Sequence, residues 1–69
     1  MKIGKRLRYF RRLRGLSQKT LGMMIGFPED SAEVRITQYE TGLRNPREKL
    51  FNAMCAALDI SPAALIAPH

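Results

Sequence analysis

Residues 16–46, with the sequence LSQKTLGMMIGFPEDSAEVRITQYETGLRNP, carry the pattern that decides the fold. Ser17 can cap a helix through its hydroxyl oxygen, and the apolar spacing after it predicts a helix over residues 18–25 that stops at Gly26. Its inward face is expected to hold Leu21, Met24 and Ile25. Gly22, in the middle of this helix, costs about 1 kcal/mol relative to alanine, which suggests that another helix packs closely there.

The second half of this segment predicts another helix. The connection over residues 27–30 contains a proline, which breaks helices, and Asp30 or Ser31 can cap the next helix. Asp30 and Glu33 also have the spacing of a capping box. A helix is therefore predicted over residues 31–41, ending at the next glycine.

Three further helices are predicted outside this segment. Apolar residues at helical spacing indicate a helix over residues 2–14. Asn45-Pro46 and Ser61-Pro62 are both typical of a helix start, with a capping side chain followed by proline in the first turn. They predict helices over residues 46–58 and 62–67.

Strand signals are weak, because the few β-branched residues never alternate over a useful length. The sequence therefore predicts an all-α fold, a compact bundle of five short helices in a single domain over residues 1–69. A chain of 69 residues buries only about 60% of its unfolded surface, so an elaborate pocket is not expected. Cys55, the one cysteine, is expected to be a small core or interface residue.

The charge is strongly basic and unevenly placed. The net charge is +6, and eight of the 12 lysines and arginines lie within the first 20 residues, before the first acid at Glu29. Such a block is typical of a protein that binds a polyanion, either nucleic acid or an anionic membrane surface, although a solvated helix face is the simpler alternative. The longest apolar run, Ala53–Leu58, falls far short of the roughly 20 residues that span a bilayer.

Four short motifs succeed one another along the chain: Leu16-Ser17-Gln18, Ile36-x-x-Tyr39-Glu40-Thr41-Gly42, Arg44-Asn45-Pro46 and Leu58-Asp59-Ile60. In this order and basic context they resemble the XRE-type helix-turn-helix family of phage repressors and Cro proteins, over residues 3–66. The resemblance implies a lambda-repressor-like DNA-binding domain whose third helix enters the major groove. The connection after Ile25 is longer than in the shortest members. It is similar to a longer-turn branch, in which a Ser-Ala-x-x-Arg-Ile sequence, here residues 31–36, begins the third helix.

The resemblance also implies contacts with the DNA backbone. Gln18 resembles the family's phosphate-binding glutamine, with Ser17 beside it, and simple capping is a compatible role for Ser17. Lys19, Thr41 and Arg44 are further phosphate candidates. These contacts would set affinity rather than sequence preference. About five or six neutralised phosphates would give a log–log salt slope on the order of −5.

Helical geometry alone predicts which residues read DNA bases. If Ile36 points to the core, Glu40 lies on the same side, about 40° away, and the outward face lies about 140° to 160° away. Ser31, Val34, Gln38 and Thr41 lie on this outward face, and Arg35 and Thr37 flank it at about 100°. The predicted base-reading residues are Ser31, Val34, Arg35 and Gln38. Gln38 suits adenine, Arg35 suits guanine or a phosphate, and Val34 suits a thymine methyl group. An ordinary solvated helix surface is the alternative.

Arg11 and Glu40 are not assigned to DNA. The resemblance implies that they form a partly buried ion pair, which locks the third helix onto the first. The inward position of Glu40 agrees with this. The alternative is that Arg11 belongs to the exposed basic face.

The expected function is a sequence-specific, double-stranded DNA-binding transcriptional regulator, a prophage-type or other bacterial repressor. No enzymatic activity, cofactor, metal or small-molecule ligand is expected. We expect a homodimer on a palindromic operator in the bacterial or phage-infected cytoplasm, at the nucleoid. The resemblance puts the dimer surface on the helices over 46–58 and 62–67 and on the loop between them. Leu65 and Ile66, if they are exposed, would form an apolar patch there. The alternatives are a protein-interaction module, such as an antitoxin-like regulatory partner, and a membrane-surface role for the first helix.

Overall fold

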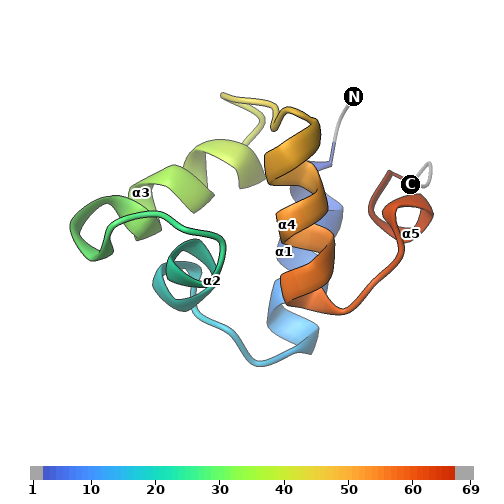
Figure 1. Ribbon diagram of the computed structural model, residues 1–69, viewed down its shortest axis with the longest axis horizontal. Coiled ribbons are helices and arrows are strands. Elements are labelled where there is room, and N and C mark those ends of the chain that lie inside the picture. The colour runs from blue at the N-terminus through green and yellow to red at the C-terminus, as the bar shows by residue number, and fades with distance from the viewer. Residues whose placement is uncertain (1–2, 67–69) are drawn as a thin grey trace.

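The computed structural model describes residues 3–66, which contain five helices and no strand. The helices are α1 (Gly4–Leu13), α2 (Gln18–Met24), α3 (Glu29–Glu40), α4 (Glu48–Leu58) and α5 (Pro62–Ile66) (Figure 1). The all-α prediction of five short helices is therefore confirmed. Residues 2 and 67, the predicted outer ends of the first and last helices, lie outside the described residues.

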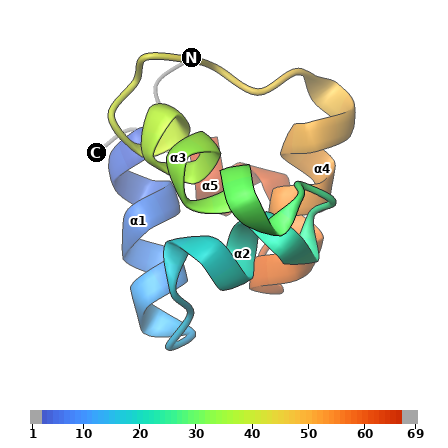
Figure 2. The ribbon, with the colours of Figure 1, turned by 90° about the vertical axis from the view of Figure 1, so that its left-hand side faces the viewer.

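The helices are arranged so that α3 is left open on one side. In Figure 1, α2 and α3 lie at one end of the molecule and α5 lies at the other. Viewed from the α3 end in Figure 2, α1 and α4 flank this pair on opposite sides. The molecule measures 32 × 23 × 20 Å.

All five helices contribute to one apolar core. The buried apolar residues are Ile3, Leu7, Leu21, Ala32, Ile36, Tyr39, Phe51, Met54, Cys55, Leu58 and Leu65. Burial also raises the pKa of the Cys55 thiol, as expected for a thiol packed as a small apolar side chain. The core position predicted for Cys55 is confirmed.

α2 and α3 cross at Gly22. A Cβ atom at this position would lie 2.7 Å from the Cβ of Ala32 and 2.8 Å from its carbonyl oxygen. Only glycine allows the two backbones this close, so the close packing predicted from Gly22 is confirmed. The crossing fixes the angle at which α3 leaves the bundle.

Two of the predicted helix caps are present. The Ser17 hydroxyl accepts a hydrogen bond from the backbone N–H of Thr20 at 3.0 Å, at the start of α2. The Ser61 hydroxyl accepts one from the N–H of Ala64 at 3.2 Å, at the start of α5. Both caps are local bonds between residues three apart, which is why sequence spacing could find them.

The predicted start of α3 is wrong. α3 begins at Glu29, with Pro28 as its N-cap, so Asp30 lies inside the first turn and forms no capping box with Glu33. The carbonyl oxygen of Pro28 accepts the N–H of Ser31 at 3.1 Å and so closes the first turn. Carboxylates in that turn are favoured by the helix dipole, so the turn is stable without a side-chain cap.

α4 also begins later than predicted. Its first residue is Glu48, and Arg47 is the N-cap without a side-chain hydrogen bond. Asn45 and Pro46 belong to an irregular connection, not to the helix. This connection must cross the top of the molecule from the end of α3 to α4, as Figure 2 shows, and an extended segment covers that distance with fewer residues than a helix.

One prediction of side-chain exposure is wrong, and the condition set for Leu65 and Ile66 is met by Ile66 alone. Met24, expected on the inward face of α2, is 53% exposed, because the buried side of this short helix is centred on Leu21. Leu65, a candidate for the apolar patch of the dimer surface, is completely buried, because α5 turns it into the core. Ile66 is 47% exposed, so it alone of this pair is available to a partner.

Candidate nucleic-acid interface

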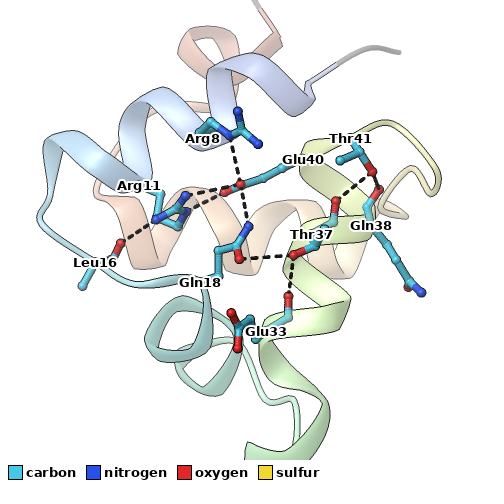
Figure 3. Close-up of polar contacts among 9 residues, drawn as sticks. All are labelled: Arg8, Arg11, Leu16, Gln18, Glu33, Thr37, Gln38, Glu40 and Thr41. Carbon is cyan, nitrogen blue, oxygen red and sulfur yellow. Dashed lines mark hydrogen bonds and ion pairs between the residues drawn. The ribbon is translucent and has the colours of Figure 1, made fainter.

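The carboxylate of Glu40, in the last turn of α3, is the centre of a polar network (Figure 3). Arg11 in α1 donates to it twice, from Nε to Oε2 at 2.6 Å and from Nη2 to Oε1 at 3.3 Å. Gln18 Nε2 in α2 donates to Oε1 at 3.0 Å, and Arg8 Nε donates to the same oxygen at 3.4 Å. One carboxylate therefore ties α3 to both α1 and α2.

The Arg11–Glu40 pair at the centre of this network is buried. Arg11 and Glu40 are 8% and 7% exposed, and Arg11 Nη1 also donates to the carbonyl oxygen of Leu16 at 2.8 Å. Burial acts to raise the pKa of Glu40, but the hydrogen bonds from Arg11 and Gln18 and the charge of Arg11 outweigh it, so the pKa lies below its usual value. Glu40 is therefore ionised at neutral pH.

The end of α3 also touches the backbone of α1. A Cβ atom at Gly4 would overlap the carbonyl oxygen of Glu40. α1 can approach α3 this closely because glycine has no side chain. Together with the contact between Gly22 and Ala32, this holds α3 at both ends.

The outward side of α3 carries the residues predicted to read bases. Val34 is 59% exposed, and the Gln38 side chain, half-buried, extends away from the Glu40 network (Figure 3). Thr41 is exposed, and its hydroxyl donates to the carbonyl oxygen of Thr37 at 2.9 Å. Ser31 is half-buried, with its hydroxyl 3.4 Å from the carbonyl oxygen of Pro28.

Arg35 lies to one side of this surface. Its guanidinium carbon is 5.2 Å from the centroid of the Phe27 ring. A guanidinium over an aromatic face is held by a cation–π interaction, so Phe27 restricts where Arg35 can reach. The Phe27 ring also stacks in parallel with Tyr39, at a centroid distance of 6.3 Å.

The three phosphate candidates at the start of α2 differ in their exposure and in their hydrogen-bond partners. Ser17 caps the helix and is exposed. Lys19 Nζ lies 2.9 Å from Glu29 Oε2, and this exposed pair joins the starts of α2 and α3. The hydrogen bond and charge of Glu29 raise the pKa of Lys19. Gln18 is half-buried and bonds to Glu40 and Thr37.

Arg44, the phosphate candidate beyond α3, lies in a basic groove. Its backbone N–H donates to the carbonyl oxygen of Gln38 at 3.1 Å, which folds the turn back against α3. The groove has a volume of about 640 Å³, and the charged residues that line it are Arg35, Arg44, Arg47 and Lys49, all of them cations. Arg47 and Lys49 were not predicted as site residues. Their proximity in sequence to Arg44 was the available signal.

Several cations of the basic N-terminal block make hydrogen bonds within the protein. Arg6 Nε donates to the carbonyl oxygen of Ala64 at 2.7 Å, in α5. Arg14 Nε donates to the carbonyl oxygen of Leu58 at 2.8 Å, and its Nη2 to that of Asp59 at 3.2 Å, at the end of α4. With Arg8 and Arg11 on Glu40, four arginines of the block make internal hydrogen bonds.

Residues 3–66 carry neither of two other kinds of site. No group of three or more His, Cys, Asp or Glu side chains could hold a metal ion there. None of the helices in this range has the length and apolar character needed to cross a membrane.

Comparison with known proteins gives one match. A family model described as helix-turn-helix matches residues 7–65. The match covers all of α2, α3 and α4 with the turns between them, most of α1 and nearly all of α5. No curated protein and no solved structure gives a significant match.

Proposed function

The chain belongs to the XRE-type helix-turn-helix family, and from that premise we propose that it is a transcriptional repressor that reads a specific sequence in double-stranded DNA. A DNA-binding regulator is the function that the family indicates. Our proposal adds that the chain is sequence-specific, that it is a repressor of a prophage or other bacterial type, and which of its residues contact DNA. The proposed place of action is the nucleoid in the cytoplasm of a bacterial or phage-infected cell.

The observation that carries this proposal is the fixed, open face of α3. Val34 and Gln38 project from a helix that is held by the Gly22 crossing and by the buried Glu40 network. A rigid helix with an exposed outer face suits insertion into the major groove. In this pose Gln38 would pair with adenine, Val34 would contact a thymine methyl group, and Ser31 and Arg35 would lie at the margins.

The cations beside α3 suit the DNA backbone. Arg44, with Arg47 and Lys49 in the same groove, would neutralise phosphates on one side of the major groove. Gln18 and Lys19 would donate hydrogen bonds from the other parts of the helix-turn-helix. Ser17 and Thr41 would donate to phosphate by turning their hydroxyl hydrogens away from Thr20 Oγ1 and from the carbonyl oxygen of Thr37. We propose that these contacts set affinity and register, while α3 sets sequence preference.

The proposed active form is a homodimer on a palindromic operator. One copy presents few base-reading residues, so two copies on half-sites about 34 to 36 Å apart would supply the missing affinity. We propose α4 and α5 as the interface, with Ile66 as its exposed apolar contact. In this arrangement α3 would lie about 17 Å from the two-fold axis, which fits a molecule 32 Å long.

The test is selection of bound duplexes from a random pool. The native chain is expected to enrich a palindromic consensus, whereas Val34→Glu with Gln38→Ala is expected to enrich none. Leu13→Glu with Asn52→Ala is a matched control, because it makes the same charge change at exposed positions on α1 and α4, and Leu13 is as exposed as Val34, at 59%. Equal enrichment by the two double variants would refute a base-reading role for α3.

A second candidate function is supported by α1. Its outward side holds Tyr9 and Leu13, each 59% exposed, around a shallow hollow of about 410 Å³ whose other lining residues are Lys5, Arg8 and Arg12. Such a surface suits an acidic amphipathic segment of another protein, as in an antitoxin-like regulatory partner. Under this alternative, Leu13→Glu would abolish partner binding and the α3 double variant would leave it intact.

A further inference from the structure

The carboxamide of Gln18 bridges two residues of α3. Its Nε2 donates to Glu40 Oε1 at 3.0 Å, and its Oε1 accepts the hydroxyl of Thr37 at 3.2 Å (Figure 3). Thr37 and Glu40 are three residues apart, so they lie on the same side of the helix, one turn from each other. Gln18 spans that turn from α2.

These two neighbours fix the orientation of the carboxamide. Glu40 is ionised and can only accept hydrogen bonds, so it must face the N–H₂ group of Gln18. Thr37 can donate its hydroxyl hydrogen to the carbonyl oxygen that remains. A flipped carboxamide would place Oε1 against a carboxylate oxygen, where both atoms carry negative charge. The network therefore selects one of the two orientations.

One donor of Gln18 is left over. Nε2 carries two N–H groups, and within residues 3–66 its hydrogen bonds go to Glu40 alone. We propose that Thr37 is a positioning residue: by holding Oε1 of Gln18, it presents the second N–H of Gln18 to a DNA phosphate. This inference rests on the proposed function, because it requires that the chain bind DNA.

Thr37 is proposed to matter for DNA binding but is not needed for the stability of the fold. It is exposed, and its one hydroxyl hydrogen can go either to Gln18 Oε1 or to the carbonyl oxygen of Glu33, 2.9 Å away, an acceptor available to any helical threonine. Removing an exposed hydroxyl leaves no buried polar group unpaired, so stability should change little. The two roles are therefore separable, since positioning affects DNA binding and a structural role would affect the melting temperature.

The experiment measures binding to the duplex selected by the native chain. Thr37→Val is expected to weaken binding about 3- to 10-fold, the effect of about one hydrogen bond, without lowering the melting temperature. Thr37→Ser keeps the hydroxyl and is expected to restore native affinity. In the Gln18→Ala background, Thr37→Val should have no further effect, because the group that it positions is gone.

Thr41→Val is the matched control. Its hydroxyl is on the same helix and bonds to backbone oxygens of α3, so its effect should be equal with and without Gln18→Ala. Replacing single phosphates by neutral methylphosphonates identifies the phosphate concerned. One such replacement should weaken the native chain, have no effect on Gln18→Ala, and have a reduced effect on Thr37→Val.

Three results would overturn the inference. Thr37→Val could bind like the native chain, or it could lose as much affinity with Gln18→Ala as without it, in which case Thr37 would act on DNA directly. A lowered melting temperature that accounts for the loss of binding would make its role structural. Failure of the native chain to enrich any duplex would refute the proposed function as well, so the two failures are distinguishable.

Discussion

The guanidinium of Arg11 lies 2.6 Å from the carboxylate of Glu40 in the interior of the protein, joining the first helix to the end of the third. Arg8 reaches the same carboxylate from the surface at 3.4 Å, with 46% of its side chain exposed. The two arginines differ in burial but share one partner. They therefore form a matched pair for measuring what the buried interaction contributes.

Arg11→Ala is expected to lower the free energy of unfolding by about 3–5 kcal/mol, because it leaves the Glu40 carboxylate buried with much of its compensation removed. Arg8→Ala is expected to cost less than about 1 kcal/mol, as is usual for a solvent-exposed ion pair. Urea denaturation followed by circular dichroism measures both. Similar losses of unfolding free energy for the two variants would show that burial of the Arg11–Glu40 pair does not increase its contribution to stability.

Glu40 also makes stability depend on pH. Its pKa is lowered in the folded state, so its contribution is fully present above the unfolded value of about 4.3 and is lost as the pH falls through the folded value. The stability difference between the native chain and Glu40→Gln should shrink as the pH is lowered from about 5 to about 2. Glu29→Gln is the control: its hydrogen bond with Lys19 also lowers the pKa of Glu29, but the pair is exposed, so its difference should change less with pH. A difference that stays constant with pH would contradict this.

Arg14→Ala is expected to destabilise the fold by about 1–2 kcal/mol, because Arg14 donates to the carbonyl oxygens of Leu58 and Asp59 at the end of α4. Arg12→Ala removes the same charge from an exposed position in the last turn of α1, close to the C-cap at Arg14, and should cost less than about 0.5 kcal/mol. Thermal melts of the two variants, side by side, measure the difference. Equal melting temperatures would mean that Arg14 acts only through its charge.

Gly22→Ala is expected to destabilise the protein although alanine is the better helix former, because its Cβ would lie 2.7 Å from that of Ala32. Adding Ala32→Gly should recover part of the loss. Recovery should be incomplete, because the carbonyl oxygen of Ala32 would remain 2.8 Å from the new Cβ. A double-mutant cycle by urea denaturation measures this coupling, and additive effects would exclude it.

The proposed phosphate contacts predict a salt dependence. Arg44→Gln and Arg47→Gln should each reduce the magnitude of the log–log salt slope of DNA binding by about 0.9, from a native value on the order of −5. Arg12→Gln, on the outward side of α1, should leave the slope unchanged. Fluorescence anisotropy over a range of salt concentrations gives the slopes. An equal reduction for all three variants would point to general attraction instead of defined contacts.

The parts of the fold that depend on neighbours in sequence could be predicted. Ser17 caps α2 through a bond three residues away, and Gly26 and Gly42 have positive φ where helices end, because caps and turns are local. The start of α3 could not be predicted, because Asp30 and Ser31 are good caps in isolation. The fold instead begins this helix at Glu29, where no capping side chain marks the start.

In the candidate site, too, some features could be predicted from neighbours in sequence and others could not. The outward positions of Val34 and Thr41 follow from helical periodicity, and both are exposed. The hydrogen bond between Gln18 and Thr37, the stacking of Arg35 on Phe27 and the basic groove at Arg44 could not be derived from periodicity. Each joins side chains whose distance depends on how two elements pack.

The sequence by itself determined that this protein is a basic, five-helix chain with a helix-turn-helix pattern. Helix periodicity, capping residues and charge depend only on residues that are close together in the chain. Only the tertiary structure decided what the charge does. Arg6, Arg8, Arg11 and Arg14 belong to one basic block, yet each bonds to an oxygen that lies far along the chain, at Ala64, Glu40 or Leu58. Hydrogen bonds act over about 3 Å of space, irrespective of separation in sequence, so the folded arrangement selects which cations remain for DNA.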